Sequence, residues 1–87
     1  MTNKEKVEEF LGGDTERTVI LYDNPSYEGA LVGVTTDDRA VYSYDKMVES
    51  LMKEDNISEE DAIDFIDYNT LGAYIDPKQP IVIFDIN

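Results

Sequence analysis

Cysteine and histidine are both absent from this chain of 87 residues. Without cysteine there is no disulfide, thiolate nucleophile or cysteine-ligated metal, and small secreted domains usually depend on disulfides. Without histidine, serine–histidine–aspartate catalysis, imidazole metal ligation and the usual proton shuttle near neutral pH are excluded. Chemistry by carboxylates alone remains, either as a paired acid and base or as oxygen ligands of Mg²⁺ or Ca²⁺. We therefore expect a cytoplasmic protein that is not an enzyme and that has no cofactor.

Long apolar runs are missing as well. The first residues, Met1 to Lys6, lead into a charged stretch and do not form a basic segment followed by an apolar run. No segment approaches the roughly 18 consecutive apolar residues that a membrane-spanning helix needs. We expect neither a targeting signal nor insertion into a membrane.

Basic residues are few, with seven Lys and Arg against 20 Asp and Glu, and the net charge is −13. Such a charge repels phosphate backbones and anionic lipids, so we expect no direct binding to nucleic acid or to a membrane. It favours a basic protein partner, but it also keeps a small domain soluble without any partner. Hydrophobic residues make up 41% of the chain, enough for one core and so for a single domain over residues 1–87. The sequence leaves the oligomeric state open.

The first half of the chain predicts one helix and three strands. Thr2 and Glu5 form a capping box, and Gly12 with Gly13 supplies the stop of a short first helix. Gly33 predicts either a bulge or a close approach of another backbone segment, and residues 35–39 predict a hairpin loop that pairs the second and third strands antiparallel. The predicted strands cover residues 18–22, 30–34 and 40–42.

The second half predicts a helical hairpin and a final strand. An amphipathic helix begins after Ser43, and its inner side chains are Tyr44, Met47, Val48, Leu51 and Met52. Ser58, with Asp61 at the third helical position, caps a further helix. The inner stripe of that helix is Ala62, Ile63, Phe65, Ile66 and Asn69. Residues 81–84 form an apolar run without alternation, which predicts a central strand covered on both faces.

The order of predicted elements is helix, three strands, two helices and one strand. This order is typical of a two-layer α+β domain in which helices pack over a mainly antiparallel sheet of about four strands. No internal repeat or linker interrupts it.

An acidic stripe is the most distinctive local feature of the sequence. No Lys or Arg occurs between Lys53 and Lys78, and helical spacing places Glu60, Asp64 and Asp67 on one outward face. Four interpretations remain open: a solvated helix face, a docking surface for a basic protein, a divalent-cation site and a carboxylate dyad in a cleft. The spacing of an EF-hand calcium loop is missing, so only weak surface binding of a cation would be expected.

Tyrosine is also enriched, with six residues in the chain. Aromatic rings with a polar tip are favoured at half-buried surfaces and at interfaces. We expect Tyr22, Tyr42 and Tyr44 in the core or at its rim. Tyr27, Tyr68 and Tyr74 are the candidates for a partner-binding surface, together with the acidic stripe of Glu60, Asp64 and Asp67.

Asn69 is the one polar residue on the predicted inner face of the third helix. Buried polar groups are nearly always hydrogen-bonded, so we expect Asn69 to bond to the backbone near the helix end. The alternative is a recognition corner formed by Tyr68, Asn69 and Thr70.

Between Gly29 and Thr70 the chain reads Gly-Ala-Leu-Val-Gly-Val-Thr-Thr-Asp-Asp-Arg-Ala-Val-Tyr-Ser-Tyr-Asp-Lys-Met-Val and, later, Glu-Glu-Asp-Ala-Ile-Asp-Phe-Ile-Asp-Tyr-Asn-Thr. This pattern, which covers roughly half of the chain, resembles a group of small bacterial and phage-borne proteins without an assigned activity. The resemblance implies a compact cytoplasmic protein of phage or prophage origin, and it supplies no catalytic residues.

Three classes of function follow from these features. The first is a non-enzymatic protein–protein interaction module that binds a basic partner through its acidic helix face. A narrower form of it is an acidic inhibitor that mimics nucleic acid and occupies the groove of a host or phage nucleic-acid-binding protein. The remaining alternatives are a carboxylate-dependent enzyme and a divalent-cation-binding domain, for which a chain with one thin core offers little room.

Overall fold

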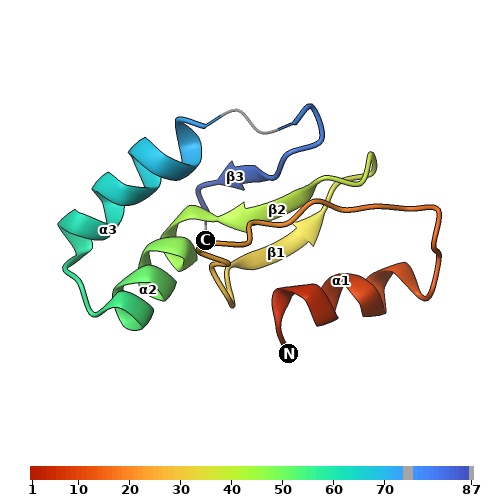
Figure 1. The fold of residues 1–87 in the computed structure, drawn as a ribbon, viewed down its shortest axis with the longest axis horizontal. Coiled ribbons are helices and arrows are strands. Elements are labelled where there is room, and N and C mark those ends of the chain that lie inside the picture. Colours follow the sequence, from red (N-terminus) through yellow and green to blue (C-terminus); the bar gives the residue numbers. More distant parts are fainter. Residues whose placement is uncertain (74–75, 87) are drawn as a thin grey trace.

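The computed structural model describes residues 1–73 and 76–86 and shows an α+β domain (Figure 1). This class agrees with the sequence prediction, although the sheet differs from it in size and direction. The elements, in chain order, are α1 (Asn3–Leu11), β1 (Leu31–Val34), β2 (Ala40–Ser43), α2 (Tyr44–Asp55), α3 (Glu59–Phe65), the π-helical segment η1 (Ile66–Leu71) and β3 (Ile81–Ile83). None of the helices in the described ranges is long and apolar enough to cross a membrane.

Helix α1 begins and ends where the sequence predicts. The Thr2 hydroxyl accepts from the N–H of Glu5 at 3.1 Å, and the Glu5 carboxylate accepts from the N–H of Thr2 at 2.9 Å. Gly12 ends the helix in the left-handed conformation, with φ of 61°, which glycine adopts without a steric cost. Val7 is buried, whereas Phe10 stays 55% exposed, so only a narrow side of this helix packs against the rest of the domain.

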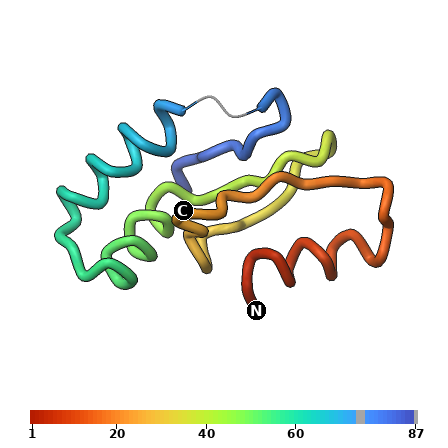
Figure 2. Tube along the Cα trace, in the orientation of Figure 1, coloured from red at the N-terminus to blue at the C-terminus, as the bar shows by residue number. Residues whose placement is uncertain are grey.

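The predicted strand over residues 18–22 is wrong, because the structure shows an extended segment there that pairs with no strand among the described residues. Figure 2 shows this part of the chain running back from the end of α1 along the sheet. Val19, Leu21 and Tyr22 pack against the core. The backbone N–H of Tyr22 donates to the side-chain oxygen of Tyr42 at 3.2 Å, so a side chain replaces a strand as its partner.

The described residues form a three-stranded mixed sheet in the order β1-β2-β3, rather than a mainly antiparallel sheet of four strands. Strands β1 and β2 pair antiparallel, and the register shifts between Leu31 and Gly33, which confirms the predicted bulge. The Thr35 N–H donates to the Arg39 carbonyl at 2.8 Å and closes the predicted hairpin loop. Strand β3 pairs parallel with β2, with Tyr42 opposite Val82.

The last strand lies at an edge of the sheet, and the prediction of a central strand covered on both faces is therefore wrong. Ile83 is 41% exposed and Phe84, which follows the strand, is 71% exposed. Strand β2 occupies the centre instead, and its Ala40, Tyr42 and Ser43 are fully buried.

Helices α2 and α3 form the predicted hairpin and pack against each other at one end of the sheet (Figure 1). The Ser43 hydroxyl accepts from the N–H of Lys46 at 3.3 Å and caps α2. The Ser58 hydroxyl accepts from the N–H of Asp61 at 3.2 Å and caps α3, as predicted. The core between these helices and the sheet contains Tyr27, Ala30, Ala40, Tyr42, Met47, Leu51, Ala62 and Ile66.

The buried side chain of Asn3 ties α1 to the turn that precedes β1. Its amide nitrogen donates to the carbonyls of Ser26 and Tyr27, both at 3.0 Å, and its amide oxygen accepts from the N–H of Gly29 at 3.3 Å. With these bonds the polar side chain is satisfied at only 2% exposure. The turn is thereby fixed so that the Tyr27 ring points into the core.

Candidate functional site

The outward face of α3 and η1 carries the carboxylates that the sequence singles out. Glu60, Asp64 and Asp67 are all exposed, and we refer to them together as the acidic face. Glu59, Glu60 and Asp61 lie in the first turn of α3, where the positive end of the helix dipole stabilises negative charge. The sequence therefore builds an exposed negative surface on a helix whose other side is anchored by buried Ala62 and Ile66.

The chain after Phe65 continues as a π-helical segment rather than as the regular α-helix that the periodicity predicts. Such segments are rare and occur often at functional sites. Asn69 is exposed, which contradicts its predicted place on the inner face. Its side-chain nitrogen donates to the Phe65 carbonyl at 3.2 Å, so the predicted bond to the backbone is confirmed. Thr70 takes the buried position and shares a hydrogen bond with the Tyr27 hydroxyl.

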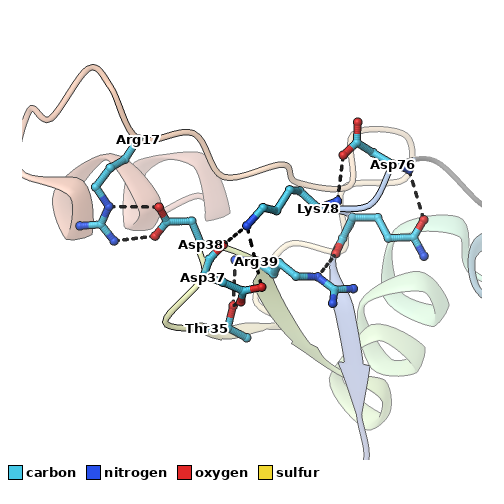
Figure 3. A network of polar contacts seen from close by, with 8 residues as sticks. Arg17, Thr35, Asp37, Asp38, Arg39, Asp76 and Lys78 are labelled. Atoms are coloured by element: carbon cyan, nitrogen blue, oxygen red, sulfur yellow. Dashed lines mark hydrogen bonds and ion pairs between the residues drawn. The ribbon is translucent and has the colours of Figure 1, made fainter.

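Three of the seven basic residues lie together at a distance from the acidic face. Figure 3 shows Arg17, Arg39 and Lys78 around the hairpin loop between β1 and β2. Arg17 pairs with Asp38 through contacts of 2.6 and 3.3 Å, and Lys78 lies 3.8 Å from a carboxylate oxygen of Asp37. This loop lies at the opposite end of the domain from α3 (Figure 1).

The same loop contacts perturb the carboxylates that they hold. The Thr35 hydroxyl, followed by the charges of Lys78 and Arg39, lowers the pKa of Asp37. The Arg17 guanidinium lowers the pKa of Asp38 through a hydrogen bond and through its charge. The contacts of Arg17 with Asp38 and of Lys78 with Asp37 are the only ion pairs within residues 1–73 and 76–86. No lysine or arginine in these ranges therefore forms an ion pair with a carboxylate of the acidic face.

Aromatic side chains border the acidic face, and Tyr44 connects them to it. The Tyr44 hydroxyl donates to a carboxylate oxygen of Asp67 at 2.9 Å. The Tyr44 ring lies against the ring of Phe84, with centroids 4.9 Å apart. Tyr68, next to Asp67 in the chain, is 83% exposed. We refer to Tyr44, Tyr68 and Phe84 as the aromatic flank.

The predicted partner-binding tyrosines have different positions in the structure. Tyr68 lies at the surface beside the acidic face, as expected. Tyr27 is only 1% exposed and belongs to the core, so its predicted exposure in the turn is wrong. The physical reason is the hydrogen bond from the buried Asn3 side chain to the Tyr27 carbonyl. This bond holds the turn with Tyr27 at a positive φ of 51° and its ring in the core. Tyr74 lies outside the described residues.

Phe84 and Tyr44 are not among the surface residues that the sequence predicts. Phe84 belongs to an apolar run that reads as a buried strand, and only the edge position of β3 exposes it. The aromatic character of Tyr44 suggested the rim of the core, which its partly buried position confirms. No local sequence signal shows that these two rings meet, because the contact joins residues on different elements.

The structure offers little support for a metal or a carboxylate dyad. Across the described part of the chain, no group of three or more Asp and Glu side chains is arranged to hold a metal ion. A hollow of about 290 Å³ lies beside the extended segment, lined by residues that include Tyr22, Asp23, Tyr27 and Thr70. Asp23 is the one acidic residue in its lining, so this hollow does not pair two carboxylates. A neighbouring hollow of about 470 Å³ is lined by both Asp23 and Glu28, but the Glu28 carboxylate already accepts from the N–H of Asn3 at 2.7 Å.

Comparisons with known proteins give no match: no protein-family model, curated protein or solved structure is significantly similar to this chain. The resemblance of residues 29–70 to bacterial and phage-borne proteins therefore stays an expectation from the sequence. Arguments about function rest on the geometry of the acidic face and the aromatic flank.

Proposed function

We propose that this domain is a non-enzymatic interaction module that binds a basic protein through the acidic face. The observation that carries the proposal is that the carboxylates of the acidic face are exposed and form no ion pair among the described residues. Arg17 and Lys78 pair with carboxylates at the hairpin loop, whereas Glu60 and Asp64 have no ion-pair partner in the described ranges. An exposed surface of carboxylates without ion-pair partners is complementary to a basic patch on another molecule.

The exposed aromatic side chains support the same proposal. Interfaces are enriched in tyrosine and phenylalanine, which bury large apolar areas when a partner covers them. Tyr68 and Phe84 are 83% and 71% exposed, and the Tyr44 ring joins Phe84 to the carboxylate of Asp67. Charge on the acidic face would accelerate encounter, and the rings would provide contact area after docking.

Affinity capture from a host lysate at low and moderate salt tests the proposal. The bait is the whole chain, compared with a variant that carries Glu60→Lys, Asp64→Lys and Asp67→Lys. We expect the wild type to retain a basic protein that is lost in the variant and released as the salt concentration rises. Release of that protein by added DNA would show that the acidic face occupies a nucleic-acid groove.

A charge-matched control separates a specific surface from a general effect of charge. Glu8, Glu9 and Glu49 are exposed glutamates on α1 and α2, and their exchange for lysine changes the net charge by the same amount. We expect this control to retain the partner. If both triple variants lose the partner equally, or if neither does, the acidic face is a solvated surface and the proposal is wrong.

A further inference from the structure

Exposed apolar side chains occur on η1 and on the chain that follows β3, and Tyr44 at the start of α2 contacts both segments, through Asp67 and through Phe84. Tyr68 and Leu71 belong to η1 and are 83% and 46% exposed. Phe84 and Ile86 follow β3 and are 71% and 97% exposed. A hydrogen bond from Ser43 to the Asp85 carboxylate, of 3.0 Å, holds this last segment against the start of α2. Ser43 and Tyr44 therefore hold Phe84 and Asp85 against the start of α2, and Tyr44 also bonds to the Asp67 carboxylate of the acidic face.

One arginine of the domain already contacts an aromatic ring and a carboxylate at the same time. The carbon at the centre of the Arg17 guanidinium lies 5.3 Å from the centroid of the Phe10 ring. The same guanidinium donates to both carboxylate oxygens of Asp38, at 2.6 and 3.3 Å. A planar guanidinium can thus contact a ring and donate to a carboxylate at once, which a lysine ammonium does less well.

We propose that the acidic face and the aromatic flank bind arginine side chains of a partner protein segment, in preference to lysine side chains. This inference rests on the proposed function and names the partner of that same surface. One guanidinium would donate to the Asp67 carboxylate and lie against the ring of Phe84 or Tyr68, as Arg17 does with Asp38 and Phe10.

The charge of the domain selects an arginine-bearing segment over other occupants of this surface. A second copy of the chain would bring a further charge of −13 and the same carboxylates, so the two acidic faces would repel each other. A purely apolar segment would bury the charges of Asp64 and Asp67 without a counter-charge, which is costly. An arginine offers both the counter-charge and a flat, weakly hydrated surface for the rings.

Titration of the isotope-labelled chain with two synthetic peptides tests this inference by NMR. One is a glycine–serine peptide that carries spaced arginines, and the other has lysine at the same positions. We expect the arginine peptide to bind about two- to fivefold more tightly, with the largest shifts at Asp67, Tyr68 and Phe84. The double variant Tyr68→Leu and Phe84→Leu should lose this preference while it keeps weak, salt-sensitive binding of both peptides.

Phe10→Leu is the matched control, because it changes an exposed ring outside the aromatic flank. It should leave the preference for arginine intact. Equal affinity for the two peptides, or a preference that survives in the double variant, would overturn this inference while the acidic face could still bind basic proteins. If neither peptide shifts the α3 and η1 signals of the wild type, the proposed function fails as well.

Discussion

The Tyr44 hydroxyl donates to the Asp67 carboxylate at 2.9 Å and thereby joins the first turn of α2 to η1. Partial burial of the phenol, and then its bond to Asp67, raise the pKa of Tyr44 to about 12. The nearby charges of Asp45 and Asp64 act in the same direction. One carboxylate of the acidic face is therefore oriented by a side chain from another helix.

Asp67→Asn should lower the pKa of Tyr44, because the variant removes the negative charge next to the phenol and leaves only a neutral, weaker acceptor for its proton. The pKa should stay above the ordinary value of 10, since partial burial remains. Titration of the tyrosine ring carbons by NMR checks this, with Tyr42 as an internal reference whose pKa should not change. An unchanged pKa of Tyr44 would show that the bond to Asp67 does not form in solution.

The buried pair of Tyr27 and Thr70 should behave as a coupled unit. Their hydroxyls share a hydrogen bond inside the core, so Tyr27→Phe or Thr70→Val leaves the other oxygen without a partner. Each single change should lower the free energy of unfolding by about 1–3 kcal/mol, and the double change should cost less than the sum. Urea denaturation of the four proteins measures the coupling; strictly additive losses would contradict it.

Gly72→Ala should destabilise the domain, whereas Gly33→Ala should be tolerated better. A Cβ atom at position 72 would lie 2.9 Å from the backbone carbonyl oxygen of Tyr68, whereas one at position 33 meets no heavy atom within 4 Å. Relief of that clash requires a shift of η1, at a cost of about 1–3 kcal/mol. Thermal unfolding of the two variants checks the order; equal stability would mean that η1 adjusts without cost.

Alkaline pH should destabilise the domain through Tyr42. This side chain is fully buried, and its burial raises its pKa from 10.0 to about 12. Since the phenol resists ionisation only when folded, its contribution to stability is complete below about pH 10 and is lost as the pH rises through about 12. The loss reaches about 2–3 kcal/mol, at about 1.4 kcal/mol for each pKa unit.

The control for this prediction is Tyr42→Phe. The variant removes the acceptor of the Tyr22 N–H and should be less stable near neutral pH. Its free energy of unfolding should nevertheless fall less steeply between about pH 10 and 12, because it lacks this titrating group. Urea denaturation across that range gives both quantities, and parallel pH curves for the two proteins would exclude Tyr42 as the cause.

Local signals in the sequence were sufficient for the features that depend on neighbouring residues. The capping box of Thr2 and Glu5, the stop at Gly12, the bulge at Gly33 and the cap at Ser58 each involve partners a few residues apart. Strand pairing depends on more distant partners: the antiparallel pairing of β1 and β2 across their short hairpin was predicted correctly, but the predictions for residues 18–22 and for β3 were wrong. Residues 18–22 have the composition of a strand but no pairing edge, and β3 reads as buried although only one of its edges is paired.

The same distinction between local patterns and distant contacts applies to the candidate site. Charge and helical spacing predicted the exposed carboxylates Glu60, Asp64 and Asp67, because helix periodicity is a local property. The contacts of Tyr44 with Asp67 and Phe84 join three elements and follow only from the assembled fold. Tyr27 was assigned to the surface because it lies in a turn, and the burial imposed by Asn3 could not be read from the turn itself.

The two partners of β2 differ greatly in how far away they lie along the chain. Strand β1 reaches β2 through a short hairpin, whereas Ile81 pairs with Val41 from 40 residues later. During synthesis the hairpin of β1 and β2 can form early. The other edge of β2 stays unpaired until α2, α3 and β3 have been synthesised. Until then its backbone groups and the Tyr42 ring remain accessible to other chains. We therefore expect newly made chains to be most prone to aggregate in the interval before the last strand pairs with β2.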